Sequence, residues 1–107
     1  MESNTTGRSC QVFIVRSKTG YQVVPGTHIT SSDSSVTFCN RAQTSVEVRL
    51  PAGVFEPSLL PLAHGQSGIT NVKPGKAGVY EYDVQDTERT NGFFATGNSS
   101  PRIIVDP

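Results

Sequence analysis

The sequence predicts an all-β protein, built as a Greek-key β-sandwich or barrel of about seven strands. Short runs rich in β-branched and aromatic residues recur at a spacing of roughly 8–12 residues, which is typical of such sandwiches. Turn-forming residues separate the runs, since the chain contains 10 glycines and 7 prolines. No segment keeps a helical period over about a dozen residues. These three observations favour an antiparallel-rich sandwich over any helical or mixed fold.

Two of the expected strands differ in their burial pattern. Residues 11–15 are apolar nearly throughout, which predicts a strand covered on both faces. Residues 46–50 alternate instead, so Val46, Val48 and Leu50 are expected to face the core and the two charged residues between them to face solvent. The remaining expected strands are 21–24, 36–40, 69–72, 79–82 and 102–105, with 28–30 as a further extended segment.

Two segments are harder to assign. Residues 51–62 carry three prolines and no clear period, which predicts an irregular excursion with Phe55, Leu59 and Leu60 packed onto the core. Residues 83–100 are polar and follow the tyrosine-containing strand, in which Tyr80 and Tyr82 share one face. We expect these residues to form one long loop before the closing strand.

Length and charge limit the classes of function. The 107 residues suit one domain, and we expect residues 1–9 to form a flexible tail and residues 10–107 a single β-sandwich domain. Lysine plus arginine and aspartate plus glutamate number nine each, which gives no electrostatic case for a nucleic-acid or anionic-membrane partner. No run approaches the ~20 apolar residues of a transmembrane helix. The first nine residues are polar, so we expect no signal peptide in this chain, although a leader that has been removed is the alternative.

Cys10 and Cys39 leave two alternatives open. They could form one disulfide in an oxidising compartment, or remain two buried thiols that serve as small apolar side chains, and we slightly prefer the thiols. Their separation is not a zinc-binding pattern.

Several short motifs follow one another along the chain: Val24-Pro-Gly26, Val36-Thr-Phe-Cys-Asn40, Leu62-Ala-His-Gly-Gln-Ser67, Lys73-Pro-Gly75, Gly78-Val-Tyr-Glu-Tyr82 and Arg102-Ile-Ile-Val105. In this order they resemble the motifs of the cupredoxins, the family of small blue-copper proteins. The resemblance covers about residues 11–106. It implies the cupredoxin fold, in which the first and third strands are adjacent and parallel. An immunoglobulin-like or carbohydrate-binding sandwich would lack that adjacency. Cys10 opens the first strand and Cys39 closes the third, so we expect parallel neighbours to hold the two cysteines at opposite ends. A Cys10–Cys39 bridge would therefore count against this topology. The resemblance also favours an extracytoplasmic location.

The copper ligands of that family are replaced. A type 1 site needs two imidazoles, one thiolate and a weak axial thioether. The position of the first histidine falls near Val46, and that of the cysteine at Asp83 or Val84. Residues 83–100 contain no histidine, and the only methionine is Met1. The resemblance therefore implies the scaffold but argues against its usual metal, and we expect neither a metal nor another cofactor.

An unconventional copper site is the alternative. Cys39 with His28 and His64 would offer the right ligand types. We expect instead that both histidines are solvent-exposed turn residues.

The long loop is the preferred binding candidate, because loops longer than ~12–15 residues in compact domains are usually functional or disordered. Asp86, Glu88 and Arg89 could form a polar site, although a solvated loop face is the simpler interpretation. Asp83 with Asp86 lacks the ligand count of a calcium loop. The pair Phe93-Phe94 could form an exposed aromatic contact, but we favour rings that fill the core beneath the loop.

No catalytic arrangement or phosphate-binding glycine loop is present in the sequence. We therefore expect a non-enzymatic cupredoxin-like module without a type 1 copper site, acting as a protein-binding or structural domain for another protein or a neighbouring domain. The alternatives are an electron-transfer protein with unconventional copper ligands, or an immunoglobulin-like or carbohydrate-binding sandwich. The sequence does not define the oligomeric state.

Overall fold

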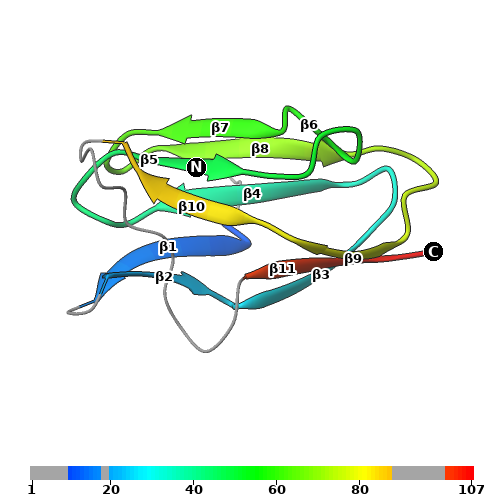
Figure 1. Cartoon of the computed structure of the whole chain (residues 1–107), viewed down its shortest axis with the longest axis horizontal. Coiled ribbons are helices and arrows are strands. Elements are labelled where there is room, and N and C mark those ends of the chain that lie inside the picture. Colours follow the sequence, from blue (N-terminus) through cyan, green and yellow to red (C-terminus); the bar gives the residue numbers. More distant parts are fainter. Residues whose placement is uncertain (1–9, 18–19, 88–100) are drawn as a thin grey trace, which may run out of the picture.

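The computed structural model of the protein describes residues 10–17, 20–87 and 101–107. Within these ranges the chain forms strands and turns and no helix, which confirms the all-β prediction (Figure 1). It follows that no helix in this part of the chain could span a membrane. The strands are β1 (Val12–Ser17), β2 (Gly20–Val24), β3 (Thr27–Ser31), β4 (Ser35–Asn40), β5 (Val46–Arg49), β6 (Phe55–Glu56), β7 (Leu59–Leu62), β8 (Ser67–Val72), β9 (Gly78–Glu81), β10 (Asp83–Asp86) and β11 (Arg102–Asp106).

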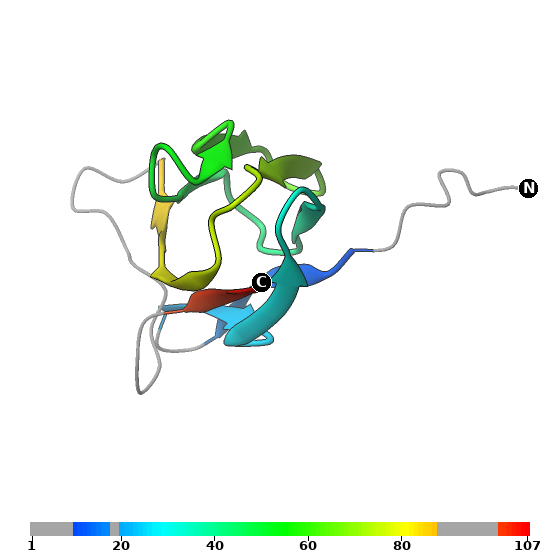
Figure 2. The same cartoon turned by 90° about the vertical axis from the view of Figure 1, so that its right-hand side faces the viewer.

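The strands form a five-stranded sheet of order β2-β1-β4-β8-β6 and two three-stranded sheets of order β10-β5-β7 and β3-β11-β9. The end-on view shows them arranged around a common interior (Figure 2). The first and third expected strands, β1 and β4, pair in parallel. This adjacency confirms the cupredoxin-like strand order and contradicts the immunoglobulin-like alternative.

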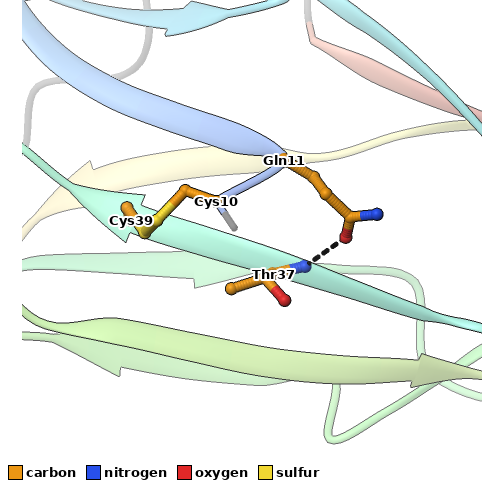
Figure 3. The surroundings of a disulfide bond; sticks show 4 residues. All are labelled: Cys10, Gln11, Thr37 and Cys39. Atoms are coloured by element: carbon orange, nitrogen blue, oxygen red, sulfur yellow. Dashed lines mark hydrogen bonds between the residues drawn. A yellow bond between two sulfur atoms is a disulfide. The ribbon is translucent and has the colours of Figure 1, made fainter. Parts of the chain in front are cut away.

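The disulfide between Cys10 and Cys39 corrects two expectations. The cysteines are bridged, with a Cα–Cα distance of 5.8 Å, so the slight preference for free thiols is wrong (Figure 3). The bridge is also compatible with parallel strands, because Phe13 pairs with Cys39 and the start of β1 therefore lies beside the end of β4. Next to the bridge, the Thr37 amide donates to Gln11 Oε1 at 2.9 Å. Parallel neighbours can be offset along their length, and this offset was not anticipated.

The core lies between the five-stranded sheet and the two smaller sheets. In the 46–50 strand the predicted alternation is confirmed, since Val46, Val48 and Leu50 are buried. Phe38 from β4 packs edge-to-face against Tyr82, between β9 and β10, with ring centroids 5.6 Å apart. The other fully buried large side chains are Tyr21, Phe55, Ile14, Ile103, Val12, Val36, Val72, Val84 and Val105.

The proline-rich segment is more regular than expected. Phe55 and Leu60 are buried, as predicted, but Leu59 is 49% exposed because β7 is a strand whose side chains alternate. Pro61 is accommodated because β7 lies at the end of its three-stranded sheet, where a missing N–H costs no ladder bond.

The predicted loop begins later than residue 83. Residues Asp83–Asp86 form β10, which pairs with β5. The expectation of a loop over 83–86 is therefore wrong. The expected tail at 1–9 and the remainder of the loop, 88–100, lie outside the described residues.

Candidate functional site

Asn40 organises the end of the fold to which the resemblance assigns copper. Its side chain is buried, and its Nδ2 donates to the carbonyl oxygens of Thr44 at 2.8 Å and Leu62 at 2.9 Å. Its Oδ1 accepts from the Ala42 amide at 2.9 Å, which closes a local turn directly after β4. The Gly65 amide donates to the Asn40 carbonyl at 3.0 Å. Asn40 thus connects the 41–45 turn to the turn between β7 and β8.

A polar cluster of Tyr21, Thr44 and Asp86 lies at the same end. The Tyr21 hydroxyl, from β2, donates to Asp86 Oδ2 of β10 at 2.7 Å, and it also hydrogen-bonds with Thr44 Oγ1. Tyr21 and Asp86 are 1% and 3% exposed. A buried carboxylate is tolerated only when hydrogen bonds replace its water. We call these three residues the Tyr21–Thr44–Asp86 cluster; it joins three segments that are far apart in the sequence.

The electrostatics of this cluster favour a neutral phenol. Burial raises the pKa of Tyr21 above its ordinary value, and the hydrogen bond to Asp86 and that residue's charge raise it further, whereas the hydrogen bond with Thr44 acts in the opposite direction. The Arg16 guanidinium lies 5.9 Å from the centre of the Tyr21 ring and also favours the phenolate. Tyr21 therefore acts as a hydrogen-bond donor to Asp86 at neutral pH.

Backbone bonds fix both ends of the segment that follows β10. The Thr87 amide donates to the Ser45 carbonyl at 3.1 Å, and the Thr87 hydroxyl donates to the same oxygen at 3.2 Å. At the other end, the Tyr82 amide donates to the Pro101 carbonyl at 3.1 Å. Thr87 and Pro101, the described residues on either side of 88–100, are thus each hydrogen-bonded to the barrel.

The residues at the expected ligand positions do not fit a type 1 copper ion. Val46 and Val84 are buried and offer no lone pair to a metal. Asp83, the other candidate for the cysteine position, is exposed, whereas Val84 beside it faces the core. Within residues 10–17, 20–87 and 101–107, no group of three or more histidine, cysteine, aspartate or glutamate residues could hold a metal ion.

The unconventional set of Cys39, His28 and His64 does not assemble either. Cys39 is in the disulfide and has no free thiolate. His64 is exposed in the turn before β8, as expected. His28 differs from the expectation of an exposed turn residue, because it lies half-buried in β3. Its Nε2 is buried and has no hydrogen-bond partner among the described residues, and burial lowers its pKa below 6.5.

The residues proposed for the long loop are placed only in part. Asp86 is buried in β10 and accepts the Tyr21 hydrogen bond, so the solvated loop face expected at this position is wrong. Asp83 and Asp86 lie on opposite faces of the strand and cannot chelate one cation together. Glu88, Arg89, Phe93 and Phe94 lie outside the described residues.

Sequence reasoning missed Tyr21 and Thr44. A tyrosine within a short strand gives a weak signal, namely that a buried hydroxyl needs a partner. The partner, Asp86, is 65 positions away, so only the three-dimensional pairing identifies it.

Comparison with known proteins supports the fold. No protein-family model and no curated protein matches the chain. Among solved structures, a copper(I) form of an amicyanin variant superposes with a TM-score of 0.56 at 17% identity, covering 92% of this chain and 85% of that chain. A purple cupredoxin from Nitrosopumilus maritimus gives a TM-score of 0.56 at 14% identity, covering 92% of this chain and 100% of that chain. A second copper(I) amicyanin variant gives 0.54 at 17% identity, with coverages of 89% and 81%.

The chain therefore has a cupredoxin-like β-sandwich fold. Identities of 14–17% show the fold alone, and they transfer no ligand or activity.

Proposed function

We propose that this protein is a non-enzymatic binding or structural module that uses the cupredoxin-like scaffold without a type 1 copper site. The observation that carries this proposal is the filling of the expected metal end by Val46, Val84 and the Tyr21–Thr44–Asp86 cluster. Hydrogen bonds and aliphatic packing connect the segments that a copper ion would otherwise join. The scaffold is then held together at this end without a metal.

The binding surface proposed is the segment after β10. Residues 88–100 begin next to Thr87 and end at Pro101, both of which are hydrogen-bonded to the barrel. A loop presented between two fixed points loses less conformational entropy on binding than a free chain does. Glu88, Arg89, Phe93 and Phe94 are the proposed contact residues, with another protein or a neighbouring domain as the partner. Asp86 is not among them, because it is buried and bonded to Tyr21.

The compartment proposed is an oxidising, extracytoplasmic one. The Cys10–Cys39 disulfide supports this location, because such bonds persist mainly in secreted and periplasmic proteins. Mass spectrometry of the protein isolated from its native source, after blocking of free thiols, should find both cysteines unmodified.

Copper titration tests the absence of a type 1 site. We expect the protein, with its disulfide intact, to bind no stoichiometric copper and to stay colourless in visible absorption, since no thiolate is available. One tightly bound copper with an intense thiolate band would overturn the proposal and favour the electron-transfer alternative.

Affinity capture tests the loop. Native protein is compared with a variant in which Glu88, Arg89, Phe93 and Phe94 are alanine and with a control in which the exposed Lys73 and Lys76 are alanine. We expect a partner that is retained by the native protein and the control but lost by the loop variant, and whose affinity for the purified domain is then measured by calorimetry. Equal retention by all three proteins would refute a role for the loop.

A further inference from the structure

Three aliphatic side chains form a row across the outer face of the β3-β11-β9 sheet. Ile104 of β11 is in register with Ile29 of β3 on one side and with Val79 of β9 on the other. Residues in register point to the same face of a sheet. Ile29 and Val79 are each 60% exposed and Ile104 is half-buried, whereas the adjacent Ile103 is fully buried in the core. The outward direction of this apolar row is thus established by the burial pattern.

The three strands lie side by side in one sheet, with the green strands of the upper layer on their other face (Figure 2). Large aliphatic residues that stand together on a solvent face often mark a contact surface, whereas isolated ones need no explanation. Leu59, at 49% exposure, is such an isolated residue, because its neighbour in register on β5 is Arg49.

Charges of opposite sign flank the apolar row on β11. Successive outward-facing residues of this strand are Arg102, Ile104 and Asp106. A cation and an anion therefore lie two residues before and two residues after the central isoleucine. Beside them on β3 stand only Thr27 and Ser31, which are small and uncharged.

We propose that this face binds the same face of a second copy of the chain, through a twofold axis that runs across the strands at Ile104. Rotation about such an axis reverses the direction of each strand but leaves its position across the sheet unchanged. The strand β11 therefore lies on the partner's β11 and runs antiparallel to it. Each residue of the apolar row then packs on its own equivalent. Arg102 lies opposite the partner's Asp106, and Asp106 opposite the partner's Arg102, so both charge pairs form at once.

Charge complementarity identifies the occupant as a second copy. The strand β11 carries both the cation, Arg102, and the anion, Asp106, at equal distances from Ile104. In a twofold dimer each of these charges therefore meets one of opposite sign. The formal net charge of the chain is +0, so two copies experience no overall repulsion. The Glu81 carboxylate, in register with Arg102, remains at the rim of the contact.

The contact is small and the dimer should be weak. With strands about 4.8 Å apart and about 3.3 Å of rise per residue, a face of three strands and five residues measures only roughly 14 by 16 Å. This size places it in the class of transient interfaces that bury less than about 1,200 Å². We therefore expect reversible self-association that depends on protein concentration and weakens with salt.

Sedimentation equilibrium over a wide concentration range, supported by NMR translational diffusion, tests the proposal on the full chain. Val79→Lys and Ile104→Asp should each weaken dimerisation by at least about tenfold, because both place a charge in the contact. Leu59→Asp, the same change at an exposed aliphatic residue of β7, should leave it unchanged. Thermal unfolding of every variant establishes that it is folded.

A charge swap tests the twofold geometry. Arg102→Asp alone and Asp106→Arg alone should each weaken dimerisation, since like charges then face each other in both pairs. The double variant Arg102→Asp with Asp106→Arg should restore it towards the native affinity. A monomer at all concentrations, or a dimer that tolerates Ile104→Asp and Val79→Lys, would overturn the proposal. Failure of the double variant to recover, in a folded protein, would overturn the proposed arrangement.

Discussion

Two buried tyrosines allow the same substitution to be made with opposite expected results. Tyr21 donates to Asp86 at 2.7 Å and also hydrogen-bonds with Thr44. Tyr82 is 4% exposed, and its hydroxyl has no hydrogen-bond partner among the described residues. Replacing either residue with phenylalanine removes one oxygen and keeps the ring. The change therefore isolates the contribution of the hydroxyl.

The magnitudes follow from these surroundings. A hydrogen bond to a charged group contributes about 1.5–3 kcal/mol, so Tyr21→Phe should lower the free energy of unfolding by about that amount. Tyr82→Phe removes a hydroxyl that was buried without compensation, at a typical cost of about 1–3 kcal/mol. That variant should be unchanged or more stable, because its ring still packs against Phe38 at 5.6 Å.

Urea unfolding followed by far-ultraviolet circular dichroism measures both changes, with the disulfide left intact. Tyrosine fluorescence is unsuitable, since the chain has no tryptophan and each substitution removes one of its three tyrosines. A double-mutant cycle with Asp86→Asn should give a coupling free energy with Tyr21 and none with Tyr82. Equal destabilisation by both phenylalanine variants, or no coupling between Tyr21 and Asp86, would refute the assignment of the cluster as a support of this end.

Three further predictions concern stability. Burial lowers the pKa of His28, so as the pH falls this histidine binds a proton in the unfolded chain before it does so in the folded one. The free energy of unfolding should therefore decline as the pH drops below the ordinary histidine value of 6.5. In a pH series of unfolding experiments, His28→Asn should flatten this decline, and His64→Asn at the exposed turn should not. The Cys10–Cys39 bond closes a loop with a sequence separation of 29, so replacing both cysteines with alanine should cost ~3–4 kcal/mol in urea unfolding, and a loss under about 1 kcal/mol would contradict the chain-entropy argument. Gly75 has a φ of 75° in the turn before β9, so Gly75→Ala should lower the free energy of unfolding by about 1 kcal/mol. Gly26 has no positive φ and has open space for an added methyl group, so Gly26→Ala should be close to neutral in the same assay.

The strands that sequence reasoning identified are those with a local signal. Alternation in residues 46–50 predicts which side chains face the core, and their burial is confirmed. Tyr80 and Tyr82 share the inner face as predicted, with Tyr82 buried and Tyr80 half-buried. The strand β10 was missed because only Val84 in it is apolar, and its identity depends on pairing with β5. The strand β7 was missed because a proline usually argues against a strand, whereas at the end of a sheet it does not.

The polar site could not be predicted for a related reason. Asp86 was selected as a candidate, but its burial depends on Tyr21, which reaches it from a distant strand. The disulfide likewise depends on the offset between β1 and β4, and no spacing in the sequence encodes that offset. Properties that require two distant segments to meet were therefore mispredicted, even where the strand order itself was predicted correctly.

The chain has the scaffold motifs of the resemblance but not its copper ligands, and this difference has a physical explanation. Asn40 makes three side-chain hydrogen bonds, Gln66 accepts from the Ala63 amide at 2.8 Å, and Tyr82 packs against Phe38. Each of these motif residues stabilises the fold whether or not a metal is present. Val46 stands where the resemblance expects a histidine, and Val84 is one of the two candidates, with Asp83, for the cysteine position. Both valines fill the core instead. A sequence can therefore form this scaffold without the coordinating residues, provided that other contacts connect the same segments. The Tyr21–Asp86 hydrogen bond and the Thr87–Ser45 bonds supply that connection.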